Sequence, residues 1–170
     1  MTINPLQWTF REQCLAGFLA CAGLLGFAVY TQLQMGLEPC PLCIFQRLAF
    51  AALAVVFLVA GLHAPRGATG RRLYGILAFV AAAVGMGIAG RHVWLQLNPP
   101  PIPGCGPPLE FMRETMSTTN VIRRVLTGSG DCGNIDWTFL GLSMPAWSLI
   151  WFVVLGGLAL HAGFRGRRTS

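Results

Sequence analysis

Two cysteines separated by a proline and a leucine have the clearest chemical potential in this chain. Cys40 and Cys43 form a C-x-x-C pair, a spacing whose disulfide closes a small ring and exchanges readily with other thiols. Pro41 suits the first position of a helix, which would make Cys40 the residue that caps it. Free N–H groups and the helix dipole at such an end would stabilise a thiolate at Cys40. The spacing therefore predicts thiol–disulfide chemistry.

A C-x-x-C pair has other common uses. It can be a static disulfide that pins a short loop, although so small a ring is more often redox-active. A zinc site would prefer a second closely spaced pair, and the next cysteines, Cys105 and Cys132, lie 27 residues apart. A haem attachment would need a histidine directly after Cys43, where Ile44 stands. We therefore expect redox chemistry and no metal site.

Arg47 lies four residues after Cys43 and seven after Cys40, so a helix would place all three on one face. If that helix enters a membrane at Cys40, Arg47 would lie about 6 Å further into the membrane than Cys43, at about 1.5 Å of rise per residue. An arginine at that depth in a membrane is costly. It would stabilise negative charge that develops near the sulfurs, for example on a bound quinone oxygen, or it would reach back to the lipid headgroups. We expect the first use.

Cys105 and Cys132 lie in the long polar segment of the chain. Prolines around Cys105 favour an extended backbone that can lie in a partner's groove and present the thiol. We expect these two cysteines to form a second disulfide, which either exchanges with a partner or staples the loop. Neighbouring glycines and prolines favour mobility and hence exchange. Together with Cys40 and Cys43, these two make four cysteines, which allow three pairings, and spacing alone does not choose between them.

Three further residues invite a chemical reading. His92 ends the third apolar stretch, where its imidazole could hydrogen-bond to a reduced cofactor or protonate it, or could simply sit at the membrane interface. Cys14 and Cys21 lie seven residues apart in the first apolar stretch, on one helix face. We expect both to be inert, because a buried cysteine usually behaves as a small hydrophobic side chain.

Apolar stretches of about 20 residues, the length that crosses a bilayer, set the architecture. The chain has 170 residues, 54% of them hydrophobic and 11% charged, whereas soluble domains carry about 25% charged residues. We predict a single integral membrane domain over residues 1–170, an all-α bundle of four transmembrane helices. The predicted spans are 14–33, 42–62, 73–92 and 144–164, with outer loops at 34–41 and 93–143.

Smaller features refine this bundle. A short amphipathic helix is expected over 109–126 in the long loop, lying on the membrane surface or packing against the bundle. Gly85, Gly87 and Gly90 are small enough to let helices approach closely. Ser143 is expected to cap the last span.

The charges predict the orientation. The formal net charge is +6 and all twelve basic residues are arginine, but many of them flank apolar spans, which argues against nucleic-acid binding. The positive-inside rule places the more basic end of the bundle, with both termini, in the cytoplasm. Cys40, Cys43, Cys105 and Cys132 would then lie outside, where disulfides persist. The arginines of the basic end are Arg11, Arg66, Arg71, Arg72, Arg165, Arg167 and Arg168.

Two stretches resemble a known family. The first, similar to the C-x-x-C segment of the disulfide-bond-formation protein B (DsbB) family of bacterial inner membranes, is Pro39-Cys40-Pro41-Leu42-Cys43-Ile44-Phe45-Gln46-Arg47. The second resembles that family's approach to its fourth helix and comprises Gly130-Asp131-Cys132 and residues 137–145. Each motif alone is moderately specific, but the combination, which extends over nearly the whole chain, is highly specific.

The resemblance implies a quinone-dependent protein-thiol oxidoreductase that supports disulfide bond formation. Members reoxidise a periplasmic DsbA-like oxidase of the thioredoxin fold. They pass the electrons to membrane quinone, usually ubiquinone, with menaquinone an option under anaerobic conditions. Carried onto this chain, the Cys105–Cys132 disulfide would accept the electrons, with Cys105 forming the mixed disulfide. The Cys40–Cys43 disulfide would then reoxidise the loop pair.

The resemblance also implies a quinone site. Cys43 would be the sulfur nearest the ring, and Arg47, His92 and Met144 would lie around it. The proline between the two cysteines and the rich proline run of the loop depart from the usual pattern. These departures leave the redox potential and the partner preference open, but not the class of reaction.

Two other classes of protein share some of these features. Vitamin K epoxide reductase-like enzymes also combine a four-helix core, a C-x-x-C pair and a quinone, but their active pair typically comes late in the bundle. A membrane scaffold or metal transporter with structural disulfides would explain the cysteines without catalysis. Arg47 and the mobile setting expected for Cys105 argue against it.

Overall fold

Long helices make up most of the protein. The computed structural model describes residues 8–36, 39–98, 114–115, 117, 119–120 and 137–165. The long helices are α1 (Phe10–Met35), α2 (Pro41–His63), α3 (Ala68–Leu97) and α6 (Met144–Phe164). A hairpin of two short strands, β1 (Thr138–Phe139) and β2 (Leu142–Ser143), precedes α6.

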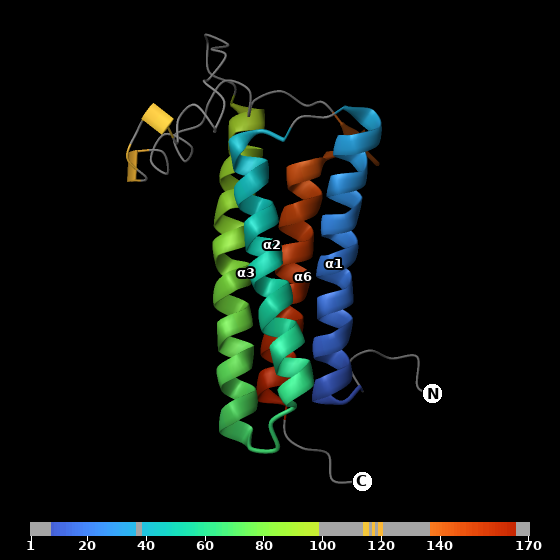
Figure 1. The fold of residues 1–170 in the computed structure, drawn as a ribbon, viewed down its shortest axis with the longest axis vertical. Helices are drawn as coiled ribbons and strands as arrows, with labels where there is room; N and C mark the ends of the chain where they lie inside the picture. The colour runs from blue at the N-terminus through green and yellow to red at the C-terminus, as the bar shows by residue number, and fades with distance from the viewer. Residues whose placement is uncertain are drawn as a thin grey trace.

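The four helices stand side by side and alternate in direction (Figure 1). Helix α3 packs against α6 and α2, and α1 packs against α2 and α6. All four are long and apolar enough to cross a membrane, and no other helix in the described residues is. This confirms the predicted all-α bundle of a multi-pass membrane protein. The start of α1, the α2–α3 link and the end of α6 lie at one end, which we call the basic end.

Local capping explains why two helices outrun the predicted spans. Helix α1 begins four residues earlier than expected because the side chains of Thr9 and Glu12 form a reciprocal capping box. Gly36 ends it in the left-handed region, at φ 63°. Helix α3 continues five residues beyond the predicted end to Leu97, where Asn98 closes it with a backbone bond to Trp94. These extra turns lengthen the helices beyond the apolar runs.

Aromatic rings and small residues fill the core. The rings of Phe50 and Phe152 stack with centroids 3.9 Å apart, joining α2 to α6. Gly85 lies directly beneath Phe152, so a side chain there would meet the ring. Gly75 lies against the α6 backbone, where an added Cβ would be 2.9 Å from the carbonyl oxygen of Ala159. The predicted close approach is therefore real at Gly85.

Not every small residue of α3 serves packing. A Cβ added at Gly87 or Gly90 would meet nothing within 4 Å in the described structure, so the predicted role of these two glycines is not borne out. The tightest backbone approach instead involves Gly75 and Gly163, which face each other across α3 and α6. These two positions lie near the basic end.

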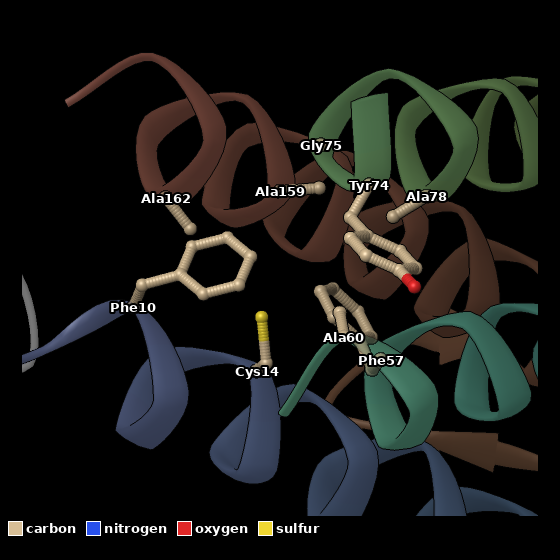
Figure 2. A pocket seen from close by; sticks show the side chains of 9 residues that line it. All are labelled: Phe10, Cys14, Phe57, Ala60, Tyr74, Gly75, Ala78, Ala159 and Ala162. Carbon is tan, nitrogen blue, oxygen red and sulfur yellow. The ribbon is translucent and has the colours of Figure 1, made fainter. Parts of the chain in front are cut away.

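Cys14 lines a small apolar cavity near the basic end. Its volume is about 10 Å³, too little to hold more than about one water molecule. The Cys14 sulfur points into this cavity between Phe10 and Phe57 (Figure 2). Cys14 and Cys21 are both free and buried. Their surroundings are those of small core side chains.

The β1–β2 hairpin, which the sequence analysis did not predict, leads directly into α6. Leu140 and Gly141 both have positive φ, as a tight two-residue turn requires. The indole N–H of Trp147 donates to the carbonyl oxygen of Phe139, and Trp137 packs edge-on against Phe27 of α1. The end of the 93–143 loop is thus anchored to the bundle. The amphipathic helix predicted over 109–126 falls mostly outside the described residues.

A candidate redox site at the start of helix α2

Cys40 and Pro41 begin helix α2 in the way that the sequence predicts. Cys40 is the N-cap, in an extended conformation, and Pro41 occupies the first turn. The backbone N–H of Cys43 donates to Cys40 Sγ over 3.4 Å, and the N–H of Ile44 donates to the Cys40 carbonyl over 3.1 Å. The Cys40 sulfur therefore lies where the helix dipole favours negative charge.

The two sulfurs of the C-x-x-C pair lie close together. Cys40 Sγ and Cys43 Sγ are 3.2 Å apart, and the Cys40 thiol is placed to donate to Cys43. A disulfide needs about 2.05 Å, so a small movement of either side chain would close the bond. Both side chains are half-buried, which leaves them accessible to a reaction partner. The pair has the geometry of a dithiol that can be oxidised in place.

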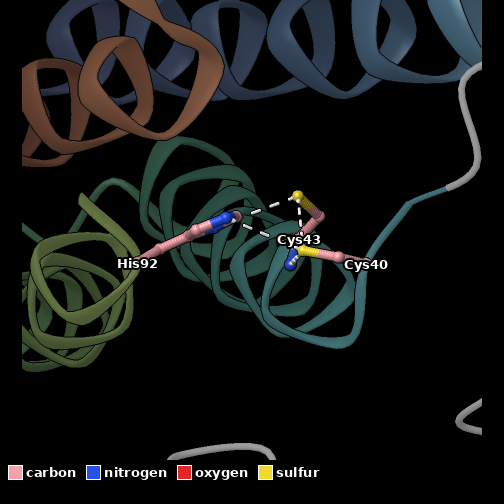
Figure 3. A group of neighbouring side chains, drawn as sticks. All are labelled: Cys40, Cys43 and His92. Carbon is pink, nitrogen blue, oxygen red and sulfur yellow. Dashed lines mark hydrogen bonds between the residues drawn. The ribbon is translucent and has the colours of Figure 1, made fainter. Parts of the chain in front are cut away.

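His92 on α3 faces both sulfurs (Figure 3). Its Nε2 is 3.8 Å from Cys40 Sγ and its Nδ1 is 4.0 Å from Cys43 Sγ. The side chain is only 2% exposed, so the imidazole is held among protein atoms rather than in the headgroup region. The sequence placed His92 at this end of the bundle, and the structure brings it into contact with the dithiol.

Gln46 holds the imidazole, and the sequence reading overlooked it. Its amide nitrogen lies 3.0 Å from His92 Nδ1, and its side chain is 4% exposed. A carboxamide can donate from nitrogen or, when turned, accept at oxygen, so Gln46 can support either neutral tautomer of His92. With one tautomer Nε2 faces Cys40 as a base, and with the other it faces Cys40 as a donor. A buried polar residue one turn after Cys43 was the available signal.

Arg47 reaches away from the sulfurs toward α1. Its Nη1 donates to Oε1 of Gln32, and its Nη2 donates to the carbonyl oxygen of Ala28 over 3.0 Å. Its guanidinium thus joins α2 to α1 one turn below the dithiol. A role of Arg47 in binding a quinone stays a prediction.

Comparison with known proteins adds what the geometry alone does not give. A family model described as "Disulfide bond formation protein DsbB" matches residues 10–162. The chain belongs to the DsbB family. It is 64% identical over 169 residues to a disulfide bond formation protein B of Xanthomonas euvesicatoria, covering 99% of this chain and 98% of the relative. A protein of the same name from Xylella fastidiosa is 59% identical over the same length, with the same shares covered.

Membership in the DsbB family indicates what the dithiol does. A family named for disulfide bond formation, together with a C-x-x-C pair at a helix start, makes this protein a membrane disulfide oxidoreductase.

Of the other residues singled out in the sequence, the structure describes Met144 and Ser143 but not Cys105 and Cys132. Met144 is the first residue of α6, half-buried at the same end of the bundle as the dithiol. Ser143 precedes it as the N-cap, but its hydroxyl donates to Gln96 of α3 over 2.6 Å instead of capping the helix. Cys105 and Cys132 lie outside the described residues, so their pairing stays a prediction.

Proposed function

We propose that this protein reoxidises a DsbA-like thioredoxin-fold oxidase and delivers the electrons to membrane quinone. The observation that carries the proposal is the Cys40/Cys43 dithiol in contact with buried His92, at the end of a DsbB-family bundle opposite the basic end. A dithiol that is oxidised in place, beside a group able to move protons, is what the last protein step of such a relay requires.

Electrons move along the relay by disulfide exchange. The partner's dithiol attacks the Cys105–Cys132 disulfide, which becomes a dithiol as the partner's disulfide forms. That loop dithiol then reduces the Cys40–Cys43 disulfide and is itself reoxidised. Each exchange breaks one S–S bond and makes one, so two electrons and two protons move at each step. The Cys40/Cys43 dithiol is left carrying them.

The residues around the dithiol fit a quinone, whose two oxygens need hydrogen-bond donors beside an apolar surface. His92 and Gln46 supply buried N–H groups. Trp94 and Leu97 expose large apolar side chains on the last turns of α3, where lipid-dissolved molecules approach. A bound quinone would supply the acceptor for two electrons and two protons.

The protein's own side chains would prepare the dithiol for this transfer. The N-terminus of α2 stabilises a thiolate at Cys40, since that sulfur accepts the Cys43 N–H. His92, 3.8 Å away, would take the thiol proton at Nε2 once the Gln46 carboxamide is turned so that its oxygen accepts from Nδ1–H. Arg47 keeps α1 packed against this end and adds positive charge one turn below the sulfurs.

The proposed orientation follows from the arginines. Arg66, Arg71 and Arg72 lie in or beside the α2–α3 link, at the end opposite the dithiol. The positive-inside rule assigns that end to the cytoplasm, so the dithiol faces the periplasm from the inner membrane.

A turnover assay tests the proposal. Reduced DsbA-like oxidase and a soluble ubiquinone analogue are mixed with the purified protein, and quinone reduction is followed optically. We expect turnover with the wild type and none with Cys43→Ala or Cys105→Ala. Arg47→Ala is expected to need more quinone for half-maximal rate. The matched control is Cys21→Ala, a buried cysteine remote from the dithiol, which should turn over normally.

Two results would contradict the proposal. Turnover that survives Cys43→Ala would remove the C-x-x-C pair from the electron path. A wild type that oxidises the partner only through dissolved oxygen, with no quinone consumed, would keep the disulfide chemistry but replace the acceptor.

A further inference from the structure

We propose that the reduced C-x-x-C pair and His92 form a binding site for a thiophilic divalent cation, Zn²⁺ in the first instance, which locks the enzyme in its dithiol state. The ligand atoms of Cys40, Cys43 and His92 all lie within 4.8 Å of one another. We expected no metal site from the sequence because no second closely spaced cysteine pair is present, whereas here the third ligand comes from α3, about 50 residues after the cysteines.

Two of the three distances between ligand atoms are close to those around a tetrahedral zinc ion, and Cys43 Sγ lies within 4.8 Å of the ligating nitrogen. Zinc binds sulfur at about 2.3 Å and imidazole nitrogen at about 2.0–2.1 Å, so tetrahedral ligands lie roughly 3.5–3.8 Å apart. Cys40 Sγ is 3.8 Å from His92 Nε2. The two sulfurs are 3.2 Å apart and must separate by about half an ångström. Half-buried cysteines provide the route of entry.

Gln46 completes the site as a positioning residue. A histidine that binds zinc through Nε2 carries its proton on Nδ1, and that N–H needs an acceptor. The Gln46 carboxamide is already 3.0 Å from Nδ1 and can present its oxygen after a half-turn. Three protein ligands leave the fourth position for water, as in zinc sites that are not closed.

Cation binding and disulfide formation exclude each other. Binding one Zn²⁺ converts two thiols into two zinc-bound thiolates and releases two protons. The Cys40–Cys43 disulfide has no thiolate to offer, so the oxidised enzyme lacks the site. Micromolar zinc would therefore accumulate the reduced form and inhibit disulfide formation. The binding itself rests on the geometry and needs neither partner nor quinone.

The first test measures binding directly. Cys105→Ser/Cys132→Ser protein, whose remaining cysteines outside the dithiol are buried in the core, is reduced and titrated with Zn²⁺ by calorimetry. We expect one Zn²⁺ per chain, none after oxidation of the Cys40/Cys43 pair, and an affinity more than tenfold weaker in the same protein carrying His92→Ala. Matched His63→Ala, at the basic end, should bind as the parent does.

Two outcomes of that titration overturn the proposal. One is the absence of stoichiometric binding to the reduced protein. The other is an affinity within twofold of the parent in His92→Ala, which would make the pair an ordinary dithiol chelate. A failed turnover assay with intact zinc binding would instead refute the proposed function alone.

X-ray absorption on the zinc-loaded parent protein gives a readout that no folding defect can mimic. We expect two sulfurs at about 2.3 Å and nitrogen or oxygen at about 2.0–2.1 Å. A shell of four sulfurs, as from two chains sharing one ion, would overturn the site. Gln46→Leu should weaken binding about tenfold, as loss of a partner of a metal ligand does, and Gln46→Glu should restore it. Equal affinities in these two variants would remove Gln46 from the site.

Discussion

At the scale of single residues, the chemistry depends on four side chains that two helices bring together. Cys40 and Cys43 come from the first turn of α2, Gln46 from the next turn, and His92 from the far end of α3. The contacts between them are 3.0–4.0 Å long. The site is therefore a dithiol in contact with an imidazole and a carboxamide rather than an isolated pair of cysteines.

His92→Ala should slow the reaction of the reduced dithiol with iodoacetamide several-fold near neutral pH. Removing the imidazole takes away the base that lies 3.8 Å from Cys40 Sγ and could accept the thiol proton as the sulfur attacks. The alkylation rate of Cys40 and Cys43 is measured by mass spectrometry. His63→Ala, whose imidazole hydrogen-bonds to Tyr74 at the other end, is the control. Equal rates in all three proteins would refute this role.

Arg47→Ala should destabilise the bundle by about 2 kcal/mol, a typical cost of losing hydrogen bonds to a charged group. The change leaves Oε1 of Gln32 without the Arg47 donor and removes the link between α2 and α1. Thermal unfolding in detergent measures the loss. The neighbouring Leu48→Ala, at a position that is 59% exposed, should cost much less. Equal losses in the two variants would show that Arg47 does not hold α1.

At the scale of the helices, close packing fixes where the redox groups meet. The α3–α6 pair approaches most closely at Gly75 and Gly163, while Phe50 and Phe152 join α2 to α6 nearer the middle. These contacts set the rotation of α3 about its axis and hence the direction in which His92 points. A shift of one residue in this packing would turn His92 by about 100°.

Gly75→Ala should destabilise the protein by about 1–3 kcal/mol, as overpacking in a tight core usually does. The new methyl group would meet the Ala159 carbonyl and the Gly163 backbone at 2.9 Å, and backbone cannot rotate away. Gly87→Ala, on the same helix with nothing within 4 Å, is the matched control and should be neutral or stabilising. Denaturation in detergent distinguishes the two, and a harmless Gly75→Ala would contradict the observed packing.

At the scale of the whole molecule, the bundle separates a redox end from a basic end. The dithiol lies at one end, while Arg72, stacked on Phe164 at 5.8 Å, lies at the other. The apolar residues between them form a barrier about one bilayer thick. Electrons would therefore enter and leave the protein on one side of the membrane.

Thiol labelling in intact cells tests this orientation. A membrane-impermeant maleimide should modify the reduced Cys40/Cys43 pair once the outer membrane is opened. A cysteine introduced by Gly67→Cys, in the α2–α3 link, should react only after the inner membrane is broken. Labelling of Gly67→Cys in sealed spheroplasts would place the basic end outside and contradict the proposed topology.

The sequence predicted the features that depend on local chemistry. Apolar length predicted the four spans, and Pro41 predicted that Cys40 caps α2, because both are properties of a short stretch of chain. The contact of His92 with both sulfurs and the turn of Arg47 toward Gln32 depend on how helices rotate against one another. A single sequence carries no direct record of that rotation. Hence the two cysteines and His92 were named from the sequence, whereas Gln46 and the contacts within the site were not.

The most direct test of the account asks whether the Cys40/Cys43 dithiol itself reduces quinone. Fully reduced Cys105→Ser/Cys132→Ser protein is mixed anaerobically with a soluble ubiquinone analogue, and quinone absorbance and free thiols are followed together. The account predicts one quinone reduced and two thiols lost per chain, with neither change when Cys43→Ala is added. Quinone that stays oxidised beside an intact dithiol, or quinone reduction without thiol loss, would contradict it.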